Sequence, residues 1–164
     1  MEKVYGATGR QDGLYKIGRN KWELIFGFGK DSEQEQTGWN YRQRFSSKPS
    51  LDEIKAIITA QIEADYAEKL MAGFEWNGKR VEYSEERKSD FTGLITGLQG
   101  GLFQLPLTMN LSDTALVLHE FTSIEEVGEV AAGICAHKTA VTNAKWQEKT
   151  SINWESEIWN GAQQ

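Results

Sequence analysis

The sequence predicts an α+β fold in which small antiparallel sheets and hairpins pack against two or three amphipathic helices. Short apolar runs with alternating polarity, separated by turn residues, predict the strands. Longer stretches carry apolar residues at helical spacing and follow serine residues in capping positions, which predicts the helices. Between alternating apolar residues stands the dipeptide Asn77-Gly78, which is the strongest short-range signal for a hairpin.

The length of 164 residues suits one domain or two small halves, which we place at residues 1–72 and 73–164. A single cysteine excludes an intramolecular disulfide, and the two histidines could form a zinc site only with scattered carboxylates. No apolar run approaches the roughly 18 to 20 residues of a membrane-spanning helix. We therefore expect no metal, no cofactor and no membrane partner.

Charge is unevenly distributed along the chain, whose formal net charge is -6. Residues 1–50 hold nine Lys and Arg against six Asp and Glu, a net charge of +3, which leaves -9 for residues 51–164. Nucleic-acid binding is an unfavoured function, because it needs a net basic surface. The asymmetry suits self-association or an oriented protein contact, although solvated acidic helix faces would produce it equally well.

The first segment predicts a three-stranded antiparallel sheet. Residues 14–18 and 21–28 are two apolar runs around a Gly-Arg-Asn turn, and residues 38–45 alternate in polarity. One face of the third strand is aromatic and the other is basic: Trp39, Tyr41, Gln43 and Phe45 lie on the first, and Asn40, Arg42 and Arg44 on the second. The aromatic face needs a cover, which favours core packing over a binding platform.

A helix that could cover this face follows directly. Ser50 and Glu53 have the spacing of a capping box, and the helix should end near Met71-Ala72 with Gly73 in the left-handed position after it. Its isoleucines fall on one stripe.

The second half begins with the Asn77-Gly78 hairpin, and Ser84 is expected to cap a helix over residues 85–99. Strands are predicted within residues 102–109 and 114–121, with Pro106 marking the first as an edge or irregular strand. A second capping box, at Ser123 and Glu126, should open a long helix that ends near Lys149. The aromatic segment 152–159 either folds back on the core or docks on a neighbouring chain.

Residues that could carry chemistry are few. Cys135 and His137 are the strongest candidates for a nucleophile and its base, but residues two apart on a helix point in different directions and do not touch. Gly27-Phe28-Gly29-Lys30 lacks the length and the Lys-Ser/Thr ending of a phosphate-binding loop. We predict a non-enzymatic protein with no catalytic residue.

Several runs resemble a known group of proteins. Residues 21–29, 38–42 and 48–55 resemble small proteins encoded by phages and prophages of Bacteroidales-type bacteria. Residues 73–78, the Ser84 cap and the long helix before Trp154 look like a domain of unknown function found near tail and tail-fibre genes. The resemblance implies a virion structural protein of the tail or its appendages, present in several copies and bound to other phage structural proteins. It would occupy the host cytoplasm during assembly and then the virion.

Two alternatives stay open, a chaperone for tail-fibre assembly and a carbohydrate-binding module that uses Trp39 and Tyr41. For the structural role we expect partner contacts at the strand edges of the first sheet and at the aromatic C-terminal segment. The candidate partner-binding residues are Trp154, Ile158, Trp159, Trp39, Tyr41, Arg42 and Arg44.

Overall fold

The computed structural model describes residues 1–161, and its chain forms two compact units. Unit 1 contains residues 1–63 and the chain from residue 148 onward, and unit 2 contains residues 64–147. Both boundaries fall inside long helices, α1 (Leu51–Ala72) and α3 (Ile124–Ser151). This division differs from the predicted halves 1–72 and 73–164. The chain returns to the first unit after residue 147, so the two units are separated by two boundaries and not by one.

Unit 1 is built on a four-stranded antiparallel sheet with the order β1-β4-β3-β2. Its strands are β1 (Glu2–Ala7), β2 (Gly13–Gly18), β3 (Lys21–Gly29) and β4 (Gly38–Phe45). The last three strands are confirmed predictions. No sequence pattern predicts β1, because this strand is short, carries two charged residues and a glycine, and lies mostly exposed at the edge of the sheet.

The buried apolar residues of unit 1 come from its sheet and from the part of α1 that belongs to this unit. Cross-strand register places Leu14 opposite Leu24 and Phe26 opposite Tyr41, and these four side chains are buried. The predicted stripe of α1 is buried in the same unit at Ile54, Ile58 and Ile62. The chain closes with a short 3-10 helix, η1 (Glu157–Asn160), which contacts β2.

One residue of the predicted basic face is buried instead of exposed. Asn40 is fully buried, and its side-chain amide donates to the carbonyls of Gly9 and Gly27 at 3.3 and 2.5 Å. The β1–β2 loop and the bulge in β3 therefore cover this part of β4, and sequence alternation alone contains no information about that cover.

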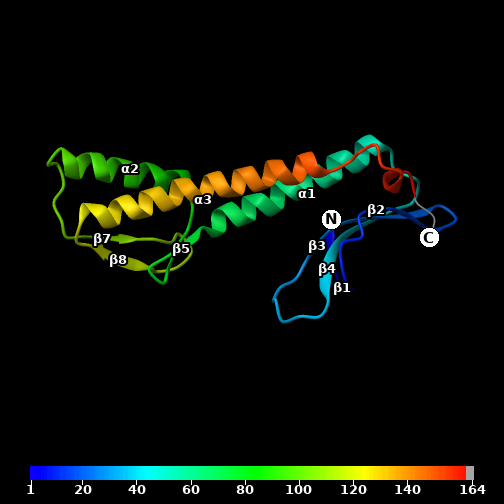
Figure 1. Ribbon diagram of the computed structural model, residues 1–164, viewed down its shortest axis with the longest axis horizontal. Coiled ribbons are helices and arrows are strands. Elements are labelled where there is room, and N and C mark those ends of the chain that lie inside the picture. The colour runs from blue at the N-terminus through cyan, green and yellow to red at the C-terminus, as the bar shows by residue number, and fades with distance from the viewer. Residues whose placement is uncertain (162–164) are drawn as a thin grey trace. The chain divides into compact units, whose positions relative to one another are not determined.

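Unit 2 packs two helices and two small hairpin sheets around one core, and Figure 1 shows α2 and α3 together above the β7–β8 pair. Its further elements are β5 (Phe74–Trp76), β6 (Lys79–Val81), α2 (Glu85–Gln99), β7 (Leu107–Asn110) and β8 (Leu118–Phe121). The core consists of the buried residues Trp76, Val81, Tyr83, Phe91, Leu94, Leu111, Phe121, Val127, Val130 and Ile134. From β7, Leu107 and Met109 pack against it partly buried. The predicted α+β class is thus confirmed.

The local signals at helix and turn boundaries are confirmed atom by atom. Asn77 and Gly78 both have positive φ, at 47° and 72°. Ser84 accepts a hydrogen bond from the backbone of Arg87 at 3.1 Å. At the start of α1, Ser50 and Glu53 form the expected reciprocal bonds.

The predicted box opens α3, and Thr122 adds further donors to it. The Glu126 backbone N–H donates to the Ser123 hydroxyl at 3.2 Å, and the Glu126 carboxylate accepts from the backbone and the hydroxyl of Thr122. The bond from the Thr122 backbone is the largest of the effects that lower the pKa of Glu126, and the Ser123 backbone is among the others.

The predicted strand pair of unit 2 is shorter than expected. Residues 102–106 are not a strand, because the N–H groups of Leu102 and Phe103 donate to the Gly97 carbonyl at the end of α2. Residues 114–117 are a loop, because side chains supply their hydrogen bonds: Val117 donates to the Asn110 amide oxygen at 2.7 Å, and Thr114 donates to Glu82. A local hydrophobic pattern contains neither set of partners.

Two glycines of this unit have a left-handed backbone conformation but different surroundings. Gly73 and Gly78 have φ near +71° and +72°, but a Cβ at Gly73 would collide with the Val81 carbonyl, whereas a Cβ at Gly78 meets nothing. Left-handed backbone costs an L-residue roughly 1–2 kcal/mol. Gly78→Ala should lower the free energy of unfolding by about that amount, and Gly73→Ala by clearly more, as measured by urea denaturation. Equal losses at the two positions would contradict the packing at Gly73.

Candidate functional site

The C-terminal aromatic segment folds back on unit 1, which was one of its two predicted alternatives. Trp159 is only 3% exposed, its indole N–H donates to the Asn153 carbonyl at 2.9 Å, and its ring lies 5.4 Å from that of Trp154. Trp159 is therefore a core residue of its unit, and its predicted role as an exposed partner contact does not fit this structure. Trp154 is half-buried, and Ile158 is the most accessible of the three at 36%.

The segment is fastened at several points. The Lys48 ammonium donates to the Asn160 carbonyl at 2.9 Å, and the backbone of Ile158 lies against Gly13 so closely that a Cβ there would be 3.2 Å from its carbonyl oxygen. Removing the apolar surface of a tryptophan side chain from water stabilises the folded protein by a few kcal/mol. The folded-back position of the segment is therefore more stable than an exposed one.

The aromatic end of β4 is an internally satisfied cluster. Asp31 accepts from the Trp39 indole at 3.0 Å and from the Tyr5 hydroxyl at 2.8 Å. The bond between Tyr5 and Asp31 is the main cause of the raised pKa of Tyr5. The Lys3 ammonium lies 4.3 Å from the centre of the Trp39 ring, and Tyr41 is buried. A stacking platform for a sugar needs an open ring face, so this geometry does not favour the carbohydrate-binding alternative.

The two basic candidates of β4 share one partner. Glu23 on β3 is buried, and its carboxylate accepts from Arg44 at 2.9 Å and from Arg42 at 3.4 Å. A shallow depression beside them is lined by these residues together with Gln43 and the start of β1. Glu23 partly neutralises the two guanidinium groups, so they are poorly suited to hold a phosphate backbone.

Cys135 and His137 are not brought together with an acidic group. Cys135 is exposed on α3, whereas the His137 ring lies 3.0 Å from the Leu70 carbonyl through Nε2 and packs near Phe74. Within residues 1–161, no group of three or more histidine, cysteine or acidic residues could hold a metal ion.

The Glu82 carboxylate is the centre of a polar network that no sequence pattern predicts. Its carboxylate accepts from the backbone N–H groups of Asp113 and Thr114 at 2.7 and 3.1 Å, and from the Thr114 hydroxyl. The Thr114 hydroxyl is the largest of the effects that lower the pKa of Glu82 to about 2, and partial burial opposes them. A carboxylate with several donors is held in its charged form.

Arg87 completes this network from α2. Its side chain is buried, donating to the Glu82 carbonyl at 2.7 Å and to the Asp113 carboxylate at 2.5 and 3.3 Å. The turn before α2 and the β7–β8 loop are therefore joined by both backbone and side-chain bonds, since the Glu82 N–H also donates to Leu111 at 3.0 Å. No sequence motif marks these residues, which lie far apart along the chain.

A second ionic cluster joins the start of α2 to α3. Glu85 accepts from Lys138 and, at 2.5 Å, from the Tyr83 hydroxyl. These two bonds lower the pKa of Glu85 to about 2, and Glu85 raises the pKa of Lys138 in return. Burial, followed by the bond to Glu85, raises the pKa of Tyr83.

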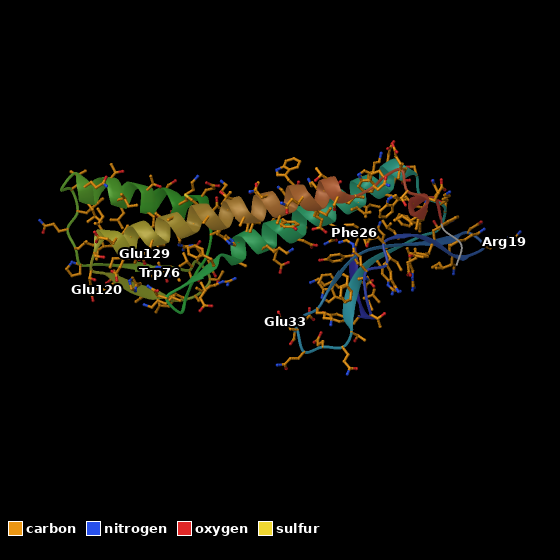
Figure 2. The ribbon with its side chains drawn as sticks, in the orientation of Figure 1. Arg19, Phe26, Glu33, Trp76, Glu120 and Glu129 are labelled. Atoms are coloured by element: carbon orange, nitrogen blue, oxygen red, sulfur yellow. The ribbon has the colours of Figure 1, made fainter. Side chains whose placement is uncertain are left out.

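His119 lies among aromatic rings and charged groups in the core of unit 2. Its ring packs edge-on against Trp76 and Phe121, with centroids 4.7 and 4.6 Å away. Lys79 lies 3.1 Å from Nδ1, and since an ammonium only donates, Nδ1 accepts and Nε2 carries the proton. The Trp76 indole donates to Glu129 at 3.0 Å, and Figure 2 shows these two side chains next to each other. The cluster fixes the β5–β6 hairpin against β8 and α3.

An accessible apolar surface of unit 2 lies in a segment free of charge. From Phe91 to Ser112 the sequence has no charged residue, although 26% of the chain is charged. Within it, Leu102 is 81% exposed and Phe103 is 51% exposed, while the Phe103 ring packs on Gly97. The gap in charge was readable from the sequence and would have been the signal for this surface, because charged residues are depleted in the centres of protein interfaces.

Comparisons of the chain with family models, with curated proteins and with solved structures found no match. No relative therefore supplies a function or a set of site residues. In the part of the chain that the structure describes, no helix is both long and apolar enough to span a bilayer.

The lowered pKa of Glu82 predicts how acid affects unit 2. Because this pKa is below its usual 4.5 in the folded protein, the stability that the charged carboxylate adds is present above pH 4.5. It should be lost as the pH falls from about 4.5 toward about 2. Glu82→Gln should lower the free energy of unfolding at pH 7 by about 1 kcal/mol, since the loop is partly solvated. Urea unfolding at several pH values should show the difference from the parent shrinking in acid.

A double-mutant cycle tests the assigned partner. Glu82→Gln and Thr114→Val should be non-additive, because Glu82→Gln removes the charge that strengthens the bond from the Thr114 hydroxyl and Thr114→Val removes that bond. The matched control is Thr92→Val, whose hydroxyl bonds only the backbone of its own helix and should be additive with Glu82→Gln. A difference that stays constant down to pH 2, or an additive cycle with Thr114, would contradict the assigned role of Glu82.

Proposed function

We propose that this chain is a non-enzymatic structural protein of a bacteriophage particle, associated with the tail or its appendages and acting through contacts with other phage structural proteins. The observation that carries the proposal is the exposed, charge-free apolar surface around Leu102 and Phe103. The resemblance of several sequence runs to phage and prophage proteins supplies the setting. During assembly the chain occupies the host cytoplasm, and afterwards the virion.

The use of the polar side chains supports a role in contacts over a role in chemistry. Glu82, Arg87 and Asp113 hold a loop, and Glu85 and Lys138 hold two helices together. Glu23 neutralises the arginines of β4. These carboxylates and cations are engaged in joining segments of the chain, whereas a catalytic group needs access to a substrate.

The shape of the Leu102 surface suits a protein partner. The backbone N–H groups of Leu102 and Phe103 are bonded to Gly97, so the two side chains are presented on a fixed turn at the end of α2. An ordered apolar projection loses little conformational freedom when it enters a pocket. The neighbouring exposed residues, among them Thr92, Thr96 and Gln104, are uncharged and add no cost of burying a charge.

Incorporation into particles tests this function. Leu102→Asp should reduce the amount of this protein in purified particles at least about tenfold, because burying an unpaired carboxylate costs several kcal/mol. Leu116→Asp is the matched control, since Leu116 is 80% exposed in the β7–β8 loop, and it should be incorporated normally. Quantitative mass spectrometry of the particles gives the readout.

The same particles separate the alternatives. A structural protein remains in mature particles, whereas an assembly chaperone is present only in intermediates. Absence of the parent protein from mature particles would contradict the structural role, and equal incorporation of both aspartate variants would contradict the Leu102 surface.

A further inference from the structure

The edge strand β1 offers an interaction surface that the Leu102 region does not use. The strand order leaves β1 and β2 at the two edges of the sheet, and within residues 1–161 β1 pairs only with β4. Its residues are mostly exposed, with Tyr5 at 61%. An edge strand presents unpaired N–H and C=O groups that another strand can bond.

We propose that β1 pairs antiparallel with β1 of a second copy of this chain, so that two four-stranded sheets join into one. A symmetric antiparallel pair has its two-fold axis perpendicular to the sheet, so residues that lie opposite each other come from the same face. Glu2 and Val4 lie on one face of the sheet, and Lys3 and Tyr5 lie on the other. A register is allowed only if each residue lies opposite a partner residue of the same face.

One of the allowed registers is favoured by charge and by the shape of β1. Pairing Lys3 with Lys3 of the partner would place like charges directly opposite, which is destabilising. Centring the pair on Tyr5 would place Gly6, where the register of β1 shifts, inside the new ladder. Centring it on Val4 separates the two lysines and leaves Gly6 only at the end of the ladder, opposite Glu2 of the partner. Val4 then faces Val4 of the partner, and each Lys3 faces a Tyr5 of the partner.

The Lys3–Tyr5 pairing is chemically complementary. An ammonium beside a tyrosine ring gains a cation–π contact, and the pair occurs twice in the symmetric dimer. Asp31 accepts a hydrogen bond from the Tyr5 hydroxyl at 2.8 Å, so this face also carries a negative charge near the incoming lysine. The Val4 pair on the opposite face buries apolar surface.

Charge and topology also favour a second copy over an open chain of copies. Residues 1–50 carry a net charge of +3 against -9 for the rest, so joining at β1 brings together the least acidic parts of two acidic molecules. At the other edge, η1 contacts β2 and Ile158 lies on Gly13, so part of that edge is already covered. A symmetric pair through β1 therefore closes as a dimer.

Disulfide trapping tests the register. In the full chain with Cys135→Ser, Val4→Cys should form a covalent dimer under mild oxidation, because the two residues meet at the two-fold axis. Lys3→Cys is the control and should cross-link far less, since Lys3 faces Tyr5 of the partner. Covalent dimer at Lys3→Cys that equals or exceeds that at Val4→Cys would overturn the register.

A pair of charge substitutions tests the contact without covalent chemistry. Tyr5→Lys places lysines opposite each other twice and should raise the dimer dissociation constant about tenfold, as measured by sedimentation equilibrium. Tyr5→Glu places a carboxylate opposite Lys3 of the partner and should leave the dimer dissociation constant unchanged or lower it. Both variants lose the bond to Asp31, and within one chain Glu at this position is repelled by Asp31 whereas Lys is attracted. A folding defect would therefore produce the reverse order.

A parent chain that stays monomeric at high micromolar concentration, or a Tyr5→Glu variant weakened as much as Tyr5→Lys, would overturn the proposal. Particle incorporation does not enter these measurements, so the dimer and the proposed function can fail separately.

Discussion

The carboxylate of Glu82 is the constraint on which the structure of unit 2 depends. It ends the β5–β6 hairpin, precedes the cap of α2 and accepts three hydrogen bonds from residues of the β7–β8 loop. Arg87 binds the same loop from the other side. Leu111 at the start of this loop is fully buried in the core, so the polar network and the apolar packing fix the same segment. A loop without ladder partners is thereby held in place by side-chain hydrogen bonds and by apolar packing.

Charged side chains join segments elsewhere in the chain too, which limits the surfaces that remain for other molecules. Each cluster of charged groups that sequence reasoning could have taken for chemistry joins two segments: Glu85 joins α2 to α3, and Glu23 joins β3 to β4. A buried or shared charge is costly to expose or redirect, since its partner would be left unpaired. The surfaces that remain for other molecules include the apolar Leu102 turn and the backbone edge of β1.

How much of this the sequence could predict depends on the range of the interactions. Caps, the left-handed Asn77 turn and the end of α1 at Gly73 are decided by residues within four positions of one another, and all were predictable. The loop of residues 114–117 was predicted as a strand because its partner Glu82 is remote in sequence. Trp159 was predicted as a partner contact. The sequence indicates that a tryptophan side chain needs burial, but it does not indicate whether the same chain or a partner covers it.

The edge of β1 shows how a short strand can allow pairing and still resist uncontrolled association. Natural sheets protect their edges with lysine residues, bulges and short length, and β1 has all three: Lys3, the register shift at Gly6 and only six residues. These features exclude most registers of an added strand, because each places a like charge or a bulge in the ladder. They do not exclude the register centred on Val4. The pairing of β1 is therefore specific because most other alignments are unfavourable. A strand without the lysine, the register shift and the short length would pair with many partners.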